Sequence, residues 1–273
     1  MVVTVEGKHD AAPPQITADD VAVREDHDRL RVTSWTPYRG DNSGLQLWIL
    51  IDDSAESSIA TQFGDVRKFI AAQPAAAQIG IGYLRNGTVE QVQPLTNDHN
   101  RAAKSLRVPV GIAGGDASPY MSLSDLIKHW PAAPAVRREV LMVTSGIDLY
   151  YGPGPQNPYL QRAIDDAQRA GVVVHSIYWG GIGHFSHDYW QVTWGQNDLA
   201  QLCDATGGEA YWQGLTSPVS FAPFLDDLTR RLENQYALTF IAPPARKGEL
   251  QRVHLSTEVP HVTLVAASRV WVP

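Results

Sequence analysis

The sequence contains a single cysteine, Cys203, among 273 residues. One cysteine excludes an internal disulfide, a cysteine cluster and a zinc knuckle. Long apolar runs are missing as well, since none approaches the roughly 20 residues needed to cross a bilayer. The given chain is therefore predicted not to insert into a membrane. Its apolar content of 44% is enough for one large buried core.

Basic residues are scarce relative to acidic ones. There are 22 lysines and arginines against 29 aspartates and glutamates, which gives a net charge of -7. A nucleic-acid partner requires a basic face, so this balance argues against such a partner.

Sequence motifs of common enzymes are also missing. There is no Gly-x-Ser-x-Gly elbow, phosphate-binding loop or dinucleotide fingerprint. The glycines of GIGYLRNG, at positions 80, 82 and 87, fall on a predicted strand and in a hairpin turn. These absences favour a non-enzymatic protein, with an α/β enzyme of hydrolase-like type as the alternative.

The stretch from Leu45 to Ile51 is an almost unbroken apolar run, which is typical of a parallel strand covered on both faces. It ends in an oxygen-rich segment that contains Asp52, Asp53, Ser54 and Glu56. Ligands of open α/β sheets bind beyond the carboxyl ends of the strands, and oxygen groups there suit a hard cation such as Mg²⁺. The alternative is that Ser57 or Ser58 only caps the next helix, with the acidic residues near its positive end.

Strand and helix patterns alternate through the middle of the chain. Apolar runs predict further parallel strands at 139–144 and 172–179, and the Asn86–Gly87 turn joins strand 77–84 to an antiparallel strand at 88–95. Helical spacing of apolar residues predicts helices at 57–70, 97–106, 121–130, 159–170, 197–206 and 219–232. The predicted fold class is α/β, a doubly wound and mostly parallel sheet flanked by helices.

Both ends of the chain carry strand patterns without helices. The predicted division is an N-terminal β segment at 1–42, an α/β domain at 43–242 and C-terminal strands at 243–273. Neither end is long enough to bury a core alone, so the two are predicted to pair into one small β unit.

The run IDDSAES at 51–57, together with the order of elements from 45 to 242, resembles a von Willebrand factor type A domain. The resemblance implies a Rossmann-like sheet with a metal-ion-dependent adhesion site. That site is built from an Asp-x-Ser-x-Ser loop, a threonine before a helix and an aspartate after a later strand. The matching positions here are Asp52, Ser54, Glu56, Ser118 and Ser145.

Ser118 falls at the threonine position, and two other positions depart from the family pattern. Glu56 stands in place of serine and Ser145 in place of aspartate; Asp148 follows three residues later, but a loop residue is a weaker candidate than one at the strand end. Magnesium demands near-octahedral geometry, so the altered set predicts that Mg²⁺ or another divalent cation binds weakly or not at all.

Further segments support the resemblance, among them LTND at 95–98 and DLAQLCDATGGEAYW at 198–212. The flanks, with QITADDVAVREDHDRLRVTSW before the first strand and NQYALTFIAPP after the last helix, are similar to the bacterial exported group of these domains. This implies an extracytoplasmic protein, secreted or periplasmic, whose signal peptide is absent from the sequence given. It also implies an adhesion-type module that binds a protein partner.

An aromatic and histidine-rich insertion, GGIGHFSHDYWQVTW, follows the strand at 172–179. It emerges at the carboxyl-end face of the sheet and is rich in the residue types that dominate interface hot spots. The predicted partner-binding residues are Trp179, His184, Phe185, His187, Tyr189, Trp190 and Trp194. One alternative is that the rings fold back over the sheet as a small core. Another is a histidine metal site made of His184, His187 and Asp188.

Overall fold

The computed structural model describes residues 1–8, 12–25, 28–111, 116–131, 136–152, 154, 156–180, 189–242 and 247–273. The central element is a six-stranded sheet in the order β6-β5-β4-β7-β8-β9. These strands span, in the same order, Thr88–Thr96, Gln78–Arg85, Leu45–Asp52, Arg137–Thr144, Val172–Tyr178 and Ala210–Tyr211. All neighbours run parallel except β6, which pairs antiparallel with β5. The predicted doubly wound, mostly parallel sheet is confirmed.

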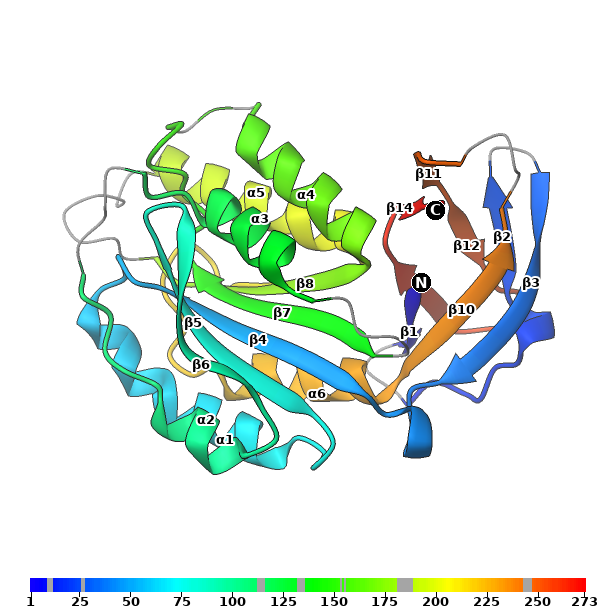
Figure 1. Cartoon of the computed structure of the whole chain (residues 1–273), viewed down its shortest axis with the longest axis horizontal. Helices are drawn as coiled ribbons and strands as arrows, with labels where there is room; N and C mark the ends of the chain where they lie inside the picture. The colour runs from blue at the N-terminus through cyan, green and yellow to red at the C-terminus, as the bar shows by residue number, and fades with distance from the viewer. Residues whose placement is uncertain are drawn as a thin grey trace.

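Helices cover both faces of this sheet (Figure 1). One face carries α1 (Phe63–Ala72), α2 (His99–Lys104) and α6 (Ala222–Glu233), and the other carries α3 (Pro119–His129), α4 (Pro158–Ala170) and α5 (Tyr189–Thr206). Side chains of β4 alternate between the two cores: Leu47 and Ile49 pack on the α1 and α6 side, and Trp48 and Leu50 on the α3 and α4 side. This double coverage explains why β4 is apolar at almost every position. No helix in the described part of the chain is long and apolar enough to cross a membrane.

The strand order places a topological switch beside β4. The chain adds β5 and β6 on one side of β4, then returns and adds β7, β8 and β9 on the other side. The loops that leave β4 and β7 therefore diverge to opposite faces of the sheet. Ligands of doubly wound proteins bind in the crevice that such a divergence opens at the carboxyl ends of the strands.

Helix α5 differs from its predicted bounds. The sequence pattern predicts a helix from residue 197 and a loop at 180–194, whereas residues 189–206 are helical. Aromatic residues and Gly195 weaken the local helix signal in this segment. Tertiary contacts compensate, because Val192 is buried and Gly195 packs directly against the backbone of Ser145.

A second sheet lies beyond the amino ends of the parallel strands, leaving their carboxyl ends uncovered by it (Figure 1). Its order is β12-β2-β3-β10-β1-β13. The strands span His254–Ser256, Ala22–Glu25, Asp28–Pro37, Gln235–Ile241, Val2–Gly7 and Val262–Ala266, and a separate pair joins β11 (Leu250–Arg252) to β14 (Arg269–Trp271). Because β1 pairs with β13 and β2 with β12, the predicted β unit of the two chain ends is confirmed. Strand β10, which the prediction grouped with residues 43–242, also belongs to this sheet and pairs with β1 and β3.

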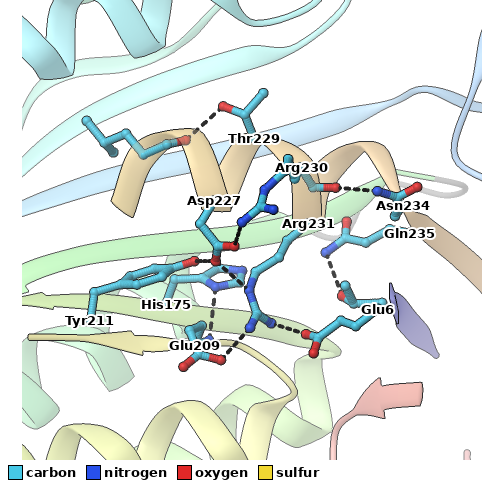
Figure 2. A network of polar contacts seen from close by, with 12 residues as sticks. Glu6, His175, Glu209, Tyr211, Asp227, Thr229, Arg230, Arg231, Asn234 and Gln235 are labelled. Atoms are coloured by element: carbon cyan, nitrogen blue, oxygen red, sulfur yellow. Dashed lines mark hydrogen bonds and ion pairs between the residues drawn. The ribbon is translucent and has the colours of Figure 1, made fainter. Parts of the chain in front are cut away.

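Arg231 of α6 joins the two sheets (Figure 2). Its guanidinium lies 2.5 Å from Glu6 of β1, 2.5 Å from Glu209 before β9 and 2.9 Å from Asp227. The backbone N–H of Glu209 in turn donates to Nδ1 of His175 on β8 at 3.1 Å. Only 13% of the Arg231 side chain is exposed, so these contacts form a partly buried charge network across the junction.

Candidate functional site

A small pocket lies at the switch point, between the carboxyl end of β4 and the amino end of α3. Its walls include Asp52, Ser54, Arg85, Ser118 and Ile147. The cavity volume is about 20 Å³, which is enough for about one water molecule. The structure thus brings three of the predicted metal-site residues together, namely Asp52, Ser54 and Ser118.

Asp52 is almost fully buried in this pocket. One carboxylate oxygen accepts from the backbone N–H of Ser54 at 3.0 Å and from its hydroxyl at 2.5 Å, and the other accepts from the Thr144 hydroxyl at 2.7 Å. Burial raises the pKa of Asp52, and the charge of Asp53 raises it further, although the hydrogen bonds from Ser54 and Thr144 lower it. The balance favours the neutral carboxyl more than in an exposed aspartate.

Asp53 does not line the pocket, and its carboxylate has two charged partners, Arg107 and, at 3.8 Å, Arg85. The Arg107 guanidinium binds its two oxygens at 2.6 and 3.2 Å, and the backbone N–H of Val110 donates to it at 3.0 Å. The guanidinium also lies over the ring of Tyr83, 3.8 Å from its centroid. Asp53 therefore fixes residues 107–111 beside the pocket.

Ser118 caps α3 and connects the pocket to Asp148. Its hydroxyl accepts from the backbone N–H of Met121 at 3.2 Å and donates to Asp148 at 2.8 Å. Sequence reasoning ranked Asp148 below Ser145 because it lies in a loop rather than at the strand end. In the structure it is Asp148 that accepts a hydrogen bond from Ser118, one of the predicted metal-site residues.

Glu56 and Ser145 do not join the other predicted ligands. Glu56 is exposed and precedes the 3-10 helix η4 (Ser57–Gln62) without capping it. The Ser145 hydroxyl accepts from the backbone N–H of Ile147 at 3.2 Å, and its carbonyl is covered by α5, where a Cβ at Gly195 would come within 2.1 Å of it. Neither residue lines the pocket. The five-residue metal set is therefore corrected to a cluster of Asp52, Ser54 and Ser118.

This cluster fits a tight magnesium site poorly. It offers one carboxylate, whose two oxygens already accept three hydrogen bonds, and two hydroxyls. In the part of the chain that the structure describes, no group of three or more histidine, cysteine, aspartate or glutamate side chains is arranged to hold a metal ion. Magnesium favours more charged oxygen ligands and exact octahedral spacing. A divalent cation stays a prediction.

The predicted partner-binding residues divide into two groups. Trp179 is 5% exposed and packs edge to face on Phe221 at 5.7 Å, so it is a core residue and we remove it from the binding surface. Tyr189 and Trp190 are 57% and 65% exposed at the start of α5, and Trp194 is partly buried. His184, Phe185 and His187 lie outside the described residues, as does Asp188 of the alternative histidine metal site.

Exposed apolar side chains gather at the carboxyl-end face. Among the described residues, ten large apolar side chains are exposed, and nine of them lie in segments that border this face. The nine are Val108, Val110, Tyr150, Tyr151, Tyr189, Trp190, Trp212, Leu215 and Val219; the tenth, Ile241, ends β10 in the second sheet. Of these nine, the predicted partner-binding set contains only Tyr189 and Trp190. The run LYYGPGP after β7, two tyrosines in a proline- and glycine-rich loop, was the available signal for Tyr150 and Tyr151.

The chain matches no protein-family model, and no curated protein matches it. Similar solved structures include a conserved hypothetical protein BatB from Bacteroides thetaiotaomicron, with 13% identity, a TM-score of 0.49, and coverage of 69% of this chain and 97% of that one. A von Willebrand factor type A protein from Catenulispora acidiphila has 12% identity and a TM-score of 0.47 over 92% of this chain and 76% of that one. Proximal thread matrix protein 1 from the mussel byssus, with a zinc-occupied adhesion-site motif, has 12% identity and a TM-score of 0.47 over 77% of this chain and 48% of that one. At such identities the similarity concerns the fold alone.

Proposed function

We propose that this protein is a non-enzymatic, adhesion-type module that binds a folded protein partner through the carboxyl-end face of its central sheet. The observation that carries the proposal is the concentration of exposed apolar side chains on that face. Exposed aromatic residues at one face mark interaction sites, because burying them against a partner removes apolar area from water.

The extent of the face favours a folded partner over a short peptide. The apolar residues occur beside β4, β7, β8 and β9, so they span most of a six-stranded sheet. With strands about 4.8 Å apart, the sheet is about 24 Å wide. This is the scale of a standard interface, which buries about 800 Å² on each partner.

The pocket at the carboxyl-end face is too small for a small-molecule substrate, and cavities of about 430 and 420 Å³ lie at the second sheet, away from this face. The pocket volume of about 20 Å³ is far below the roughly 300 to 1,000 Å³ of typical small-molecule sites. An extracytoplasmic location is part of the same proposal, and it rests on the similarity of the flanking segments to exported proteins.

The experiment compares two exposed apolar residues on different faces. Trp190→Ser changes the proposed surface, and Ile241→Ser changes a side chain of similar exposure, 65% against 54%, in the second sheet. The immobilised protein first retains its partner from native extract, and the dissociation constant is then measured with the purified partner. We expect Trp190→Ser to weaken binding at least tenfold and Ile241→Ser to leave it within twofold, with both melting temperatures unchanged. Equal weakening by both variants, or retention unaffected by Trp190→Ser, would refute the proposed surface.

A further inference from the structure

A single buried carboxylate, that of Asp148, accepts four hydrogen bonds from four residues. One oxygen accepts from the backbone N–H groups of Tyr150 and Tyr151 at 3.1 and 3.0 Å. The other accepts from the Ser118 hydroxyl at 2.8 Å and from the Asn157 side-chain amide at 3.1 Å. Asp148 is 3% exposed, so water does not replace these donors.

The two sides of this carboxylate serve different parts of the molecule. The tyrosine side fixes a turn that leaves the Tyr150 and Tyr151 rings about half exposed, and both rings pack edge to face on Tyr159 of α4. The other side holds the hydroxyl that lines the pocket and the amide of the residue that caps α4. Asp148 thereby connects the pocket, the α4 cap and the exposed tyrosines.

We propose that Asp148 is a positioning residue that presents Tyr150 and Tyr151 to the partner in a fixed geometry and ties them to the pocket edge. The inference rests on the proposed function, because it assigns the tyrosine pair to the same binding face. A turn ordered in advance binds more tightly, since less conformational entropy is lost when the partner docks. The tyrosine rings supply large contact area with few rotatable bonds.

A carboxylate is required at this position because all four neighbours donate. An ionised aspartate only accepts, whereas an asparagine at 148 would turn its own NH₂ toward the NH₂ of Asn157. Asn157 cannot flip to relieve this conflict, because its carbonyl oxygen accepts from the backbone N–H groups of Tyr159 and Leu160 at 2.9 and 3.3 Å. Asparagine at 148 therefore avoids the conflict by turning its carbonyl oxygen toward Asn157 and its NH₂ toward the N–H groups of Tyr150 and Tyr151, and the tyrosine turn loses its hydrogen bonds.

The same geometry predicts that a second substitution, at position 157, restores the hydrogen bonds of the tyrosine turn. In Asp148→Asn combined with Asn157→Asp, the new amide at 148 donates to the new carboxylate at 157. Aspartate at 157 still caps α4, since aspartate and asparagine are equally good N-cap residues. The carbonyl oxygen at 148 again accepts from the N–H groups of Tyr150 and Tyr151. The reciprocal swap should therefore restore the tyrosine turn without restoring the original residue.

The experiment measures amide exchange at Tyr150 and Tyr151 by NMR together with affinity for the partner identified with the wild-type chain. We expect Asp148→Asn to accelerate exchange at both amides at least tenfold and to weaken binding at least tenfold. The reciprocal swap should return both quantities to within threefold of wild type. Asp98→Asn is the matched control, because Asp98 is also an N-cap, on α2, and holds only the N–H of Arg101; it should change neither quantity.

A second pair of variants keeps the test decisive if Asp148→Asn is too unstable to study. Tyr150→Ser combined with Tyr151→Ser alters exposed rings and leaves the Asp148 carboxylate in place, so it should fold and bind at least tenfold more weakly. Protected tyrosine amides in Asp148→Asn would overturn the positioning role, even if Trp190→Ser still abolished binding. Loss of protection with unchanged affinity, or full affinity without the two rings, would also overturn it. Loss of the Trp190 effect, in contrast, would count against the proposed face as a whole.

Discussion

Asp52 and Asp53 are neighbours in the sequence and have opposite environments in the structure. Asp53 is ion-paired with Arg107, whereas Asp52 accepts hydrogen bonds from hydroxyls and a backbone amide without a cationic partner in the pocket. The end of the strand lies between them: β4 ends at Asp52, and Asp53 is in the turn that follows, which the N–H of Ala55 closes on the carbonyl of Asp52 at 3.1 Å. The sequence motif identified Asp52 as the pocket residue, and the ionic partner of Asp53 could not be found because Arg107 lies 54 positions away.

Asp198 of α5 gives a prediction about pH. Burial, followed by the nearby charge of Asp148, raises the pKa of Asp198 to about 7. Its folded pKa is thus above the unfolded value of about 3.9, so folding stability should fall as pH rises from about 4 to 7 and stay lower above that.

Asp198→Asn mimics the protonated carboxyl and should remove the loss of folding stability that ionised Asp198 causes above about pH 4. We expect it to raise the free energy of unfolding by about 1 to 2 kcal/mol at pH 8, since partial exposure reduces the full effect of the shift. At pH 4 it should change little. Urea denaturation at both pH values provides the measurement, and an equal gain at pH 4 and pH 8 would contradict the raised pKa.

At the scale of elements, local pattern was sufficient for β4, β7 and β8, whose apolar runs are covered on both faces. The local pattern did not predict the amino-terminal part of α5, and it did not show which sheet β10 joins. A strand's apolar pattern does not reveal which sheet it joins, and Gln235 directly follows the α6 cap at Asn234. The site shows the same limit: the pocket residues at the ends of β4 and α3 are predicted from the sequence, and Ser145 is preferred to Asp148 for its place at a strand end. The packing of α5 against Ser145 is a tertiary contact that the local sequence does not reveal.

The contact between α5 and the loop after β7 can be tested with two glycines. Gly195→Ala would place a Cβ 2.1 Å from the carbonyl oxygen of Ser145, which is backbone and cannot move away cheaply. We expect it to lower the free energy of unfolding by about 2 to 3 kcal/mol, as overpacking does. Gly64→Ala in α1 is the control, since nothing lies within 4 Å of that position. Alanine is the better helix former, so Gly64→Ala should stabilise by about 0.5 to 1 kcal/mol. Equal effects in thermal denaturation would show that helix propensity, not close packing, governs position 195.

For the whole molecule, the second sheet and the proposed binding face lie at opposite ends of the parallel strands. The second sheet lies beyond the amino ends of the parallel strands, and the apolar face is formed by segments near their carboxyl ends (Figure 1). Two ion pairs connect the terminal strands to helices of the α/β domain. Arg231 of α6 contacts Glu6 of β1 in the second sheet (Figure 2), and Arg269 of the separate β11–β14 pair lies 2.5 Å from Asp165 of α4. We infer that the second sheet stabilises the α/β domain without covering its binding face.

Arg231→Gln tests whether the ion pairs of Arg231 stabilise the contact between the two sheets. The guanidinium faces Glu6, Glu209 and Asp227, so its removal leaves carboxylates in a partly buried site without their cation. Breaking a buried ion pair by removing one partner costs about 3 to 5 kcal/mol, and partial exposure places the expected loss near the lower end. Strands β1 and β13 should lose amide-exchange protection more than β4 does, because β1 is the strand that Arg231 contacts.

Two further variants determine whether the charge network is responsible. Arg162→Gln is the control, because Arg162 is 62% exposed and its ion pair with Asp166, at 3.9 Å, should contribute less than 1 kcal/mol. Adding Glu6→Gln to Arg231→Gln removes one of the carboxylates that are left without a cation, and it should recover part of the lost stability. A uniform loss of amide-exchange protection across both sheets in Arg231→Gln would indicate that the two sheets unfold together as one cooperative unit. No recovery on adding Glu6→Gln would show that Glu6 is not the coupled partner, and the lost stability would then be assigned to Glu209 and Asp227.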